Sequence, residues 1–304
     1  MNRRIRLCFS CTLAILFASA ATAQETPYTQ RENVVYGEAH GVGLVMDIFT
    51  PVGAKNGVGV VDVISGAWYS DRGKIRDHTR AQTFHILCRK GYTVFAIRPG
   101  SVTKFGVPEM LANLNQGIRW VKEHSKEYEV DPQRLGMMGA SAGGHLACLA
   151  AVTAEDAKAD GSGPPSVPGT RVKAVAVFFP PTDFVKYGEK IVDARADDRT
   201  GQLVRKLAFP QGIGNDTAEE VQKKVMQISP ARLVTPNAPP FLLIHGDADP
   251  LVPLQQSEVM LAALKEAGVP AELIVKKGGG HPWPTLHEEV QVIADWFDRQ
   301  LTAP

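Results

Sequence analysis

The sequence has 304 residues, of which 44% are apolar and 21% charged, so it can bury the core of one large globular domain. Its formal charge of +1 becomes −2 for residues 24–304, because residues 1–23 hold three arginines and no acid. This balance predicts neither a nucleic-acid partner nor an anionic membrane as partner.

Residues 1–23 have the pattern of an export signal. A basic start is followed by an apolar run and by the A-x-A cleavage site Ala21-Thr22-Ala23. We expect cleavage after Ala23, a secreted or periplasmic chain of residues 24–304, and no membrane attachment after cleavage. The alternative is an N-terminal membrane anchor, for which the apolar run is short.

Few cysteines remain after removal of this segment. Cys88 and Cys148 both lie in apolar helical patterns, which predicts buried free thiols rather than a disulfide. The cysteines and the eight histidines show no metal-ligand spacing. We therefore expect neither a metal nor an organic cofactor.

The remaining chain reads as an antiparallel start followed by alternating strands and helices. Residues 33–37 and 44–49 alternate in polarity and predict a hairpin that turns at 41–43. Short apolar runs predict buried strands, and spaced apolar positions predict helices. The strands are expected at 59–64, 93–97, 135–138, 172–179, 241–244 and 273–275, and the helices at 76–90, 110–128, 143–154, 254–267 and 286–301. This order predicts an α/β domain with one mostly parallel sheet of about eight strands and helices on both faces.

Two segments interrupt the alternation. Residues 155–170 are rich in Gly, Pro, Ala and Asp and predict a surface loop. Residues 183–232 form a long, mostly polar and helical excursion between two strands. An excursion over the carboxyl edge of the sheet would serve as a small cap beside a site there.

The segment from Gly139 to Gly143 reads G-x-S-x-G, directly after a predicted strand and before a predicted helix. This is the setting of a nucleophile elbow, in which small neighbours permit a strained turn at Ser141. The Ser141 hydroxyl would stand at the helix N-terminus, where the N–H of Ala142 can meet an oxyanion. The same five letters are also common in ordinary turns.

A nucleophilic serine needs a histidine base and an acid that orients the histidine. In chains with a nucleophile elbow, the three residues occur in the order serine, acid, histidine. Asp247 and Asp249 follow the predicted strand 241–244, and His281 follows the next strand after a glycine run. Asp247 is the competing acid, because a strand-end aspartate often braces its turn. The competing histidines are His145, His245 and His287.

Three motifs together resemble those of the α/β-hydrolase superfamily: G-x-S-A-G-G-H-L-A, H-G-D-x-D-x-x-V-P and the late histidine after glycines. More narrowly, they are similar to its secreted esterase branch, with acetyl-xylan and feruloyl esterase-like proteins and relatives of the hormone-sensitive-lipase group. The resemblance covers roughly residues 33–301. It implies the α/β-hydrolase fold, with Ser141 as nucleophile, Asp249 as acid and His281 as general base.

The loop that should complete the oxyanion hole departs from this resemblance. Many relatives carry His-Gly-Gly-Gly or His-Gly-Gly-x-Trp where this chain has Ile64-Ser65-Gly66-Ala67-Trp68. Because a backbone N–H does not depend on the side chain, we expect Ala67 or Trp68 to donate, with Gly66 as an alternative.

Three aromatic residues lie beside these motifs. Trp68, Tyr69 and Trp283 are expected to line a substrate pocket, with packing in the core as the competing role of each.

The resulting hypothesis is a serine esterase acting on short acyl or carbohydrate-linked acetyl or feruloyl esters. A serine peptidase of the prolyl-oligopeptidase type is one alternative, although no propeller precedes the hydrolase segment. A catalytically silent hydrolase-fold binding protein is the other. The oligomeric state is left open by the sequence.

Overall fold

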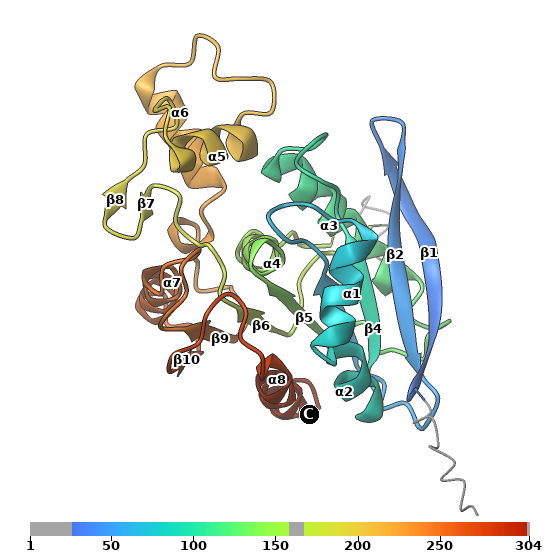
Figure 1. Cartoon of the computed structure of the whole chain (residues 1–304). Helices are drawn as coiled ribbons and strands as arrows, with labels where there is room; N and C mark the ends of the chain where they lie inside the picture. The colour runs from blue at the N-terminus through green and yellow to red at the C-terminus, as the bar shows by residue number, and fades with distance from the viewer. Residues whose placement is uncertain (1–25, 158–166, 303–304) are drawn as a thin grey trace, which may run out of the picture.

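A single eight-stranded sheet runs through the computed structural model, which describes residues 26–157 and 167–302 (Figure 1). The expected signal segment, residues 1–23, lies outside the described residues. So do residues 158–166 of the predicted surface loop. Within the described residues, no helix combines the length and apolar character needed to cross a membrane.

The strand order is β1-β2-β4-β3-β5-β6-β9-β10, with the first two pairings antiparallel and the others parallel. The predicted mostly parallel sheet with an antiparallel N-terminal hairpin is thus confirmed. The strands are β1 (Tyr28–Ala39), β2 (Val42–Pro51), β3 (Gly59–Val63), β4 (Thr93–Arg98), β5 (Leu135–Ala140), β6 (Ala174–Phe178), β9 (Phe241–Gly246) and β10 (Ala271–Lys276).

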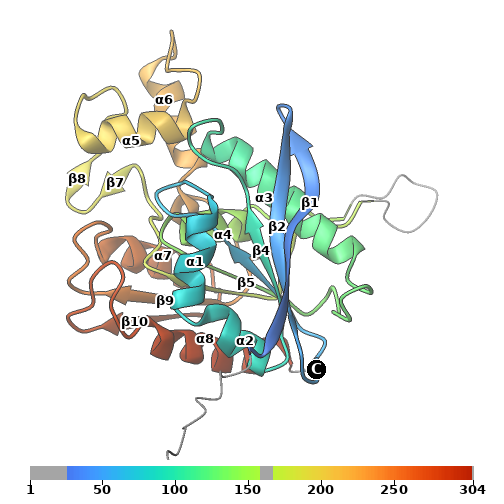
Figure 2. The same ribbon diagram turned by 45° about the vertical axis from the view of Figure 1, so that its right-hand side comes forward.

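Helices cover both faces of the sheet, as expected from buried parallel strands (Figure 2). On one face α1 (Arg72–Arg80), α2 (Thr83–Arg89) and α8 (Leu286–Leu301) enclose one buried apolar cluster. On the other face α3 (Val107–Glu123), α4 (Ala142–Val152) and α7 (Gln255–Glu266) enclose the second. Cys88 and Cys148 are buried free thiols, as predicted.

Two local predictions need correction. The helix expected over 76–90 is two helices, because Gln82 takes a left-handed backbone conformation with φ 59° that interrupts the helix between α1 and α2. The N-terminal hairpin turns on His40 and Gly41 rather than on residues 41–43, since Ala39 pairs with Val42 and Gly43 already belongs to β2.

The 183–232 segment contains more than helices. It begins with the short hairpin β7 (Lys186–Tyr187) and β8 (Lys190–Ile191), which was not predicted. It continues with α5 (Arg199–Ala208), α6 (Ala218–Gln227) and a 3₁₀ turn at Pro230–Arg232. Figures 1 and 2 show these elements together at one end of the molecule, beyond α4.

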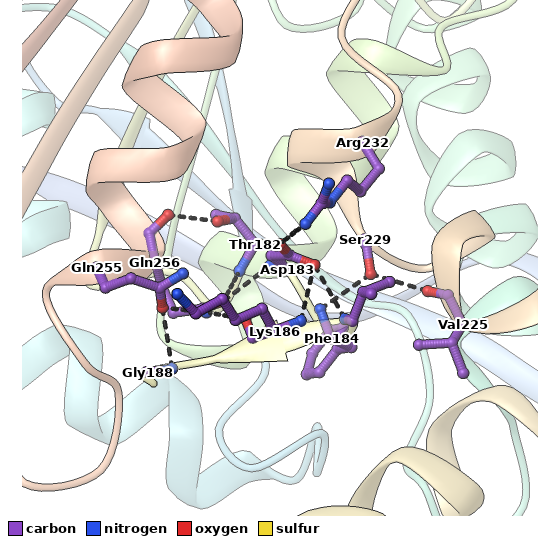
Figure 3. Close-up of polar contacts among 11 residues, drawn as sticks. Thr182, Asp183, Phe184, Lys186, Gly188, Val225, Ser229, Arg232, Gln255 and Gln256 are labelled. Carbon is purple, nitrogen blue, oxygen red and sulfur yellow. Dashed lines mark hydrogen bonds and ion pairs between the residues drawn. The ribbon is translucent and has the colours of Figure 1, made fainter. Parts of the chain in front are cut away.

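An ion pair joins the first and last residues of this segment (Figure 3). The Asp183 side chain is 2% exposed, and its Oδ2 accepts hydrogen bonds from Arg232 Nε at 3.1 Å and Nη2 at 2.6 Å. Oδ1 accepts the backbone N–H of Val185 at 2.9 Å. The segment is therefore closed at its base, where a buried carboxylate has both oxygens bound.

Gln256 of α7 binds the backbone at the start of this segment and holds it against the core (Figure 3). It is fully buried, and its Oε1 accepts the N–H groups of Thr182 at 2.7 Å and Asp183 at 2.8 Å. Its Nε2 donates to the carbonyl of Lys186 at 3.0 Å. One side chain thus provides hydrogen-bond partners for three backbone groups that are not paired in a sheet.

Replacing Gln256 by leucine should lower the free energy of unfolding by about 2–4 kcal/mol, because three buried backbone groups lose their partner. Urea unfolding followed by circular dichroism measures the change. The matched control is Gln291→Leu on α8, where an exposed glutamine donates to Asp295, its one hydrogen-bond partner in the described ranges, and the change should stay within about 0.5 kcal/mol. Equal effects of the two substitutions would contradict the role given to Gln256.

Candidate active site

The turn from β5 into α4 holds Ser141 in an unusual backbone conformation. Its φ is 54° and its ψ −120°, outside the regions that L-residues normally occupy. The Ser141 N–H donates to the carbonyl of Phe178 at the end of β6, and its carbonyl accepts the N–H of His145 in α4. The strand, the neighbouring strand and the helix together hold this strained turn in place.

Two glycines make the turn possible, as the G-x-S-x-G pattern predicts. A Cβ on Gly139 would lie 2.5 Å from the Gly143 carbonyl carbon, and one on Gly143 would lie 2.2 Å from the Val63 carbonyl oxygen. These obstacles are backbone atoms, which cannot rotate away. The absence of side chains at both positions therefore lets α4 start directly against β3.

Ser141, His281 and Asp249 form one hydrogen-bonded chain. The Oγ of Ser141 lies 2.9 Å from His281 Nε2, and His281 Nδ1 lies 2.6 Å from Asp249 Oδ2. The ring of Phe179 packs on His281, with centroids 4.4 Å apart. The structure thus brings together, from three separate loops, the three residues that the sequence singled out.

The Asp249 carboxylate is enclosed, and its side chain has no exposed surface. Burial by itself raises the pKa of Asp249, but contacts with His245 and His281 and two backbone N–H groups lower it more, so the net pKa lies below the ordinary value. The N–H groups of Leu251 and Val252 donate to Oδ1 at 2.8 and 2.9 Å. Asp249 is therefore an acceptor only, so His281 carries its proton on Nδ1 and presents the Nε2 lone pair to Ser141.

The competing acid has another task. Asp247 is exposed, and its Oδ1 accepts the N–H of Gly278 at 2.6 Å. It thereby joins the loop after β9 to the loop after β10. This is the turn-bracing role expected of a strand-end aspartate.

The competing histidines are placed elsewhere. His245 is buried, with Nδ1 2.7 Å from Ser257 Oγ and Nε2 donating to the Val252 carbonyl at 2.9 Å. His145 is also buried and accepts from Trp68 Nε1 at 3.1 Å, and this burial lowers its pKa to about 4. His287 lies near the start of α8 and only borders the cavity. Among the described residues, none of these three rings is hydrogen-bonded to the Ser141 hydroxyl, whose ring partner is His281.

The loop after β3 presents free backbone donors. Gly66 and Tyr69 exchange two backbone hydrogen bonds of 2.9 Å, so the N–H of Gly66 is already occupied. Ala67 and Trp68 form the tip of this turn with φ values of 48° and 60°. In the described part of the chain, the N–H groups of Ala67, Trp68 and Ala142 bind no acceptor. Ala67 and Trp68 line the same cavity as Ser141, and Ala142 follows Ser141 directly in the chain.

A cavity of about 1040 Å³ opens over Ser141 and His281. Trp68 and Trp283 line it although both are nearly buried, and their indole N–H groups donate to His145 and Glu289. The structure does not place Tyr69 in the lining; its side chain lies in an exposed position instead. Trp68 and Trp283 thus combine the packing role with the pocket position.

The cavity also has lining residues that sequence reasoning did not single out, some of them in the predicted cap segment. The 183–232 segment contributes residues of β7 and α5 to the lining, among them Arg199 and Lys206. Helix α1 contributes His78, which is paired with Asp62 of β3. No motif joins positions 62 and 78, so only the packing of α1 on β3 reveals the pair. In the described ranges, no group of three or more His, Cys, Asp or Glu is arranged to hold a metal ion.

Comparison with known proteins gives a consistent result. Residues 46–264 match the BD-FAE family. The probable carboxylic ester hydrolase LipM of Mycobacterium tuberculosis is 30% identical over 206 residues, which are 66% of this chain and 43% of that protein. Esterase LipQ of the same organism is 29% identical over 217 residues, 69% of this chain and 46% of that protein. The chain thus spans about half the length of these curated relatives.

A solved structure is similar over its whole length. The truncated form of a carbohydrate esterase from gut microbiota superposes with a TM-score of 0.75 and is 25% identical, covering 92% of this chain and 99% of that chain. The expected α/β-hydrolase fold is thereby confirmed.

The glycine requirement of the turn can be measured on two adjacent residues. Gly143→Ala should lower the free energy of unfolding by at least about 2 kcal/mol, since its Cβ meets the backbone of β3. Gly144→Ala is the matched control, because the same helix gains the same propensity while the nearest atom lies at 3.2 Å. We expect the control to stay within about 1 kcal/mol of the wild type. Similar urea midpoints for both variants would show that the turn tolerates a side chain.

Proposed function

The chain belongs to the BD-FAE family, a family of α/β-hydrolase esterases, and from this premise we propose that it is a serine carboxylic-ester hydrolase. The observation that carries the proposal is the hydrogen-bonded chain from Ser141 through His281 to Asp249. A serine in a strained turn, a histidine with a free Nε2 lone pair and an ionised acid are the requirements of acyl transfer through a covalent intermediate.

In the proposed mechanism, His281 Nε2 takes the proton of Ser141 as Oγ attacks the ester carbonyl. Asp249 stabilises the imidazolium that forms, because its carboxylate accepts from Nδ1. The negative charge on the carbonyl oxygen is met by the N–H of Ala142 and by Ala67 or Trp68 of the loop after β3.

The second half of the reaction uses the same groups. His281 gives its proton to the leaving alkoxide, and the alcohol departs. Water then attacks the acyl-enzyme with His281 again as base, releasing the acid and restoring the Ser141 hydroxyl. No step calls for a metal or an organic cofactor.

We infer that the substrates are short acyl esters or acetyl and feruloyl groups linked to carbohydrate. The similarity to a carbohydrate esterase supports a sugar ester. Trp68 and Trp283 would border the ester. The 183–232 segment would act as a small cap, and its residues on the cavity wall support that role.

Export of the chain is part of the proposal and is supported by the sequence pattern of residues 1–23. Expressed with this segment in a bacterial host, the protein should appear outside the cytoplasm with Gln24 as its first residue. N-terminal sequencing of the exported protein measures this. A product that stays in the membrane fraction and begins at Met1 would support the membrane anchor instead.

Ester hydrolysis tests the catalytic assignment. The wild type should hydrolyse p-nitrophenyl acetate or butyrate, acetylated xylan or methyl ferulate, and Ser141→Ala should not. Asp249→Asn should lower kcat by about 10³–10⁴-fold, because His281 loses the acceptor that orients it. Asp247→Asn is the matched control on the same loop and should change kcat by less than about fivefold, the effect of one exposed hydrogen bond.

Three results would contradict this assignment. If the wild type and Ser141→Ala were equally inactive on every ester, the esterase function would be contradicted. A larger effect of Asp247→Asn than of Asp249→Asn would make Asp247 the acid. Cleavage of a prolyl peptide amide alone would favour a peptidase.

A further inference from the structure

A second aspartate–histidine pair reaches the same cavity through its histidine and has no part in the proposed mechanism. Asp62 lies in β3 with its side chain fully buried, and its Oδ2 is 2.7 Å from His78 Nδ1. The other oxygen of Asp62, Oδ1, is buried and has no hydrogen-bond partner among the described residues. His78 is therefore the only basic side chain bonded to this enclosed carboxylate there.

The imidazole of His78 binds Asp62 through Nδ1, which leaves Nε2 available for a ligand. Its Nδ1 is bonded to Asp62, and its side chain is 12% exposed and borders the cavity. In the described part of the chain, Nε2 has no protein partner and is not one of the buried unpartnered atoms. Nε2 is thus accessible from the cavity.

The surroundings of His78 favour its charged form. Burial lowers the pKa of His78, but the attraction of Asp62 and the hydrogen bond to it raise the pKa more. Asp77 adds to this effect and Lys74 opposes it, both on α1, and the pKa ends above its ordinary value. Arg80 of α1 and His287 of α8 are further titratable groups in the cavity lining. In the protonated ring, Nε2 presents an N–H donor that carries positive charge.

The rest of the cavity lining is also electropositive. It contains four permanently cationic side chains, Lys74, Arg80, Arg199 and Lys206, against the single carboxylate of Asp77. Arg199 and Lys206 form no ion pair within the described residues. Because the chain as a whole is almost neutral, this excess of positive charge is a local property that attracts anions.

The sheet register sets the distance between the two sites. Asp62 pairs with Met138 of β5, three residues before Ser141. At about 3.3 Å per residue, Asp62 lies roughly 10 Å along the strand direction from the reacting serine. The cavity lining also includes the apolar residues Met138, Phe178 and Val290. A flexible chain of several carbon atoms can span this gap.

We propose that the cavity takes esters bearing a free carboxylate, and that His78, held by Asp62, binds that carboxylate. The inference rests on the proposed esterase function and adds the substrate's charge to it. The carboxylate donates nothing and accepts from Nε2–H, so the buried Asp62, the imidazolium and the bound anion alternate in charge. The carboxylate can belong to the acyl group or to the alcohol, which the test distinguishes.

The acyl arm compares monoethyl adipate with ethyl 6-methylheptanoate, in which an isopropyl group replaces the carboxylate. The alcohol arm compares 4-acetoxybenzoate with 4-acetoxybenzamide. In at least one arm the wild type should prefer the anionic ester in kcat/KM by about tenfold or more, and His78→Gln should remove the preference, since a charge-assisted hydrogen bond is lost. The arm that responds identifies the side of the ester.

The matched control is Arg76→Gln, which removes an exposed cation from the same helix without touching the cavity. It should leave the preference unchanged. If Arg76→Gln reduced the preference as much as His78→Gln, general electrostatic attraction would explain it and the His78 site would be overturned. Equal rates on the anionic and neutral esters in both arms would overturn it as well.

A binding measurement keeps the site testable apart from catalysis. Ser141→Ala protein should bind adipate by calorimetry at pH 6, with a shift of the His78 Nε2 resonance in NMR spectra. Binding should weaken as the pH rises through the raised pKa of His78 and the imidazolium loses its proton. Absence of adipate binding at pH 6 would overturn the His78 site. If adipate binds but the wild type is inactive on every ester, only the esterase function is contradicted.

Discussion

The close contact between the β5–α4 turn and the end of β3 is the constraint on which the rest of this site depends. Gly143 lies against the Val63 carbonyl, with no room for a Cβ, and donates its N–H to the Ser65 carbonyl at 3.0 Å. This contact places the loop from Ser65 to Trp68 beside the serine turn. The position of Ser141 and the position of the free N–H groups are therefore consequences of one backbone packing.

Electrostatics then distinguishes groups that look alike in the sequence. His281 and His145 are both close to the serine in the fold, but only His281 meets a buried carboxylate on one nitrogen and the hydroxyl on the other. His145 has a neutral donor and a carbonyl as partners, and burial keeps its pKa low. The neighbours of each ring, more than the residue type, decide what it can do.

The cavity is assembled from parts of the chain that are far apart. It is lined by residues of β5 and β6, of α1 and α8, and of the 183–232 segment. That segment is held at its base by the Asp183–Arg232 ion pair and by Gln256, so it has a defined place relative to the serine (Figure 3). The side chains of α1 and α5 give the cavity lining an excess of positive charge, although the net charge of the whole chain is only +1.

The sequence by itself predicted the eight strands of the main sheet, most of the helices, the serine turn, and His281 and Asp249 as its partners, because these depend on local patterns: apolar periodicity, two glycines and short motifs at strand ends. It also placed the ends of the 183–232 segment at the two residues that form an ion pair. Only the tertiary structure decided that Asp247 braces a turn, that the N–H of Gly66 is occupied, and that Tyr69 stands away from the cavity. The Asp62–His78 pair belongs to the same class, because a contact between a strand and a helix sixteen positions apart follows from how the two elements pack, and no pattern within either element records it.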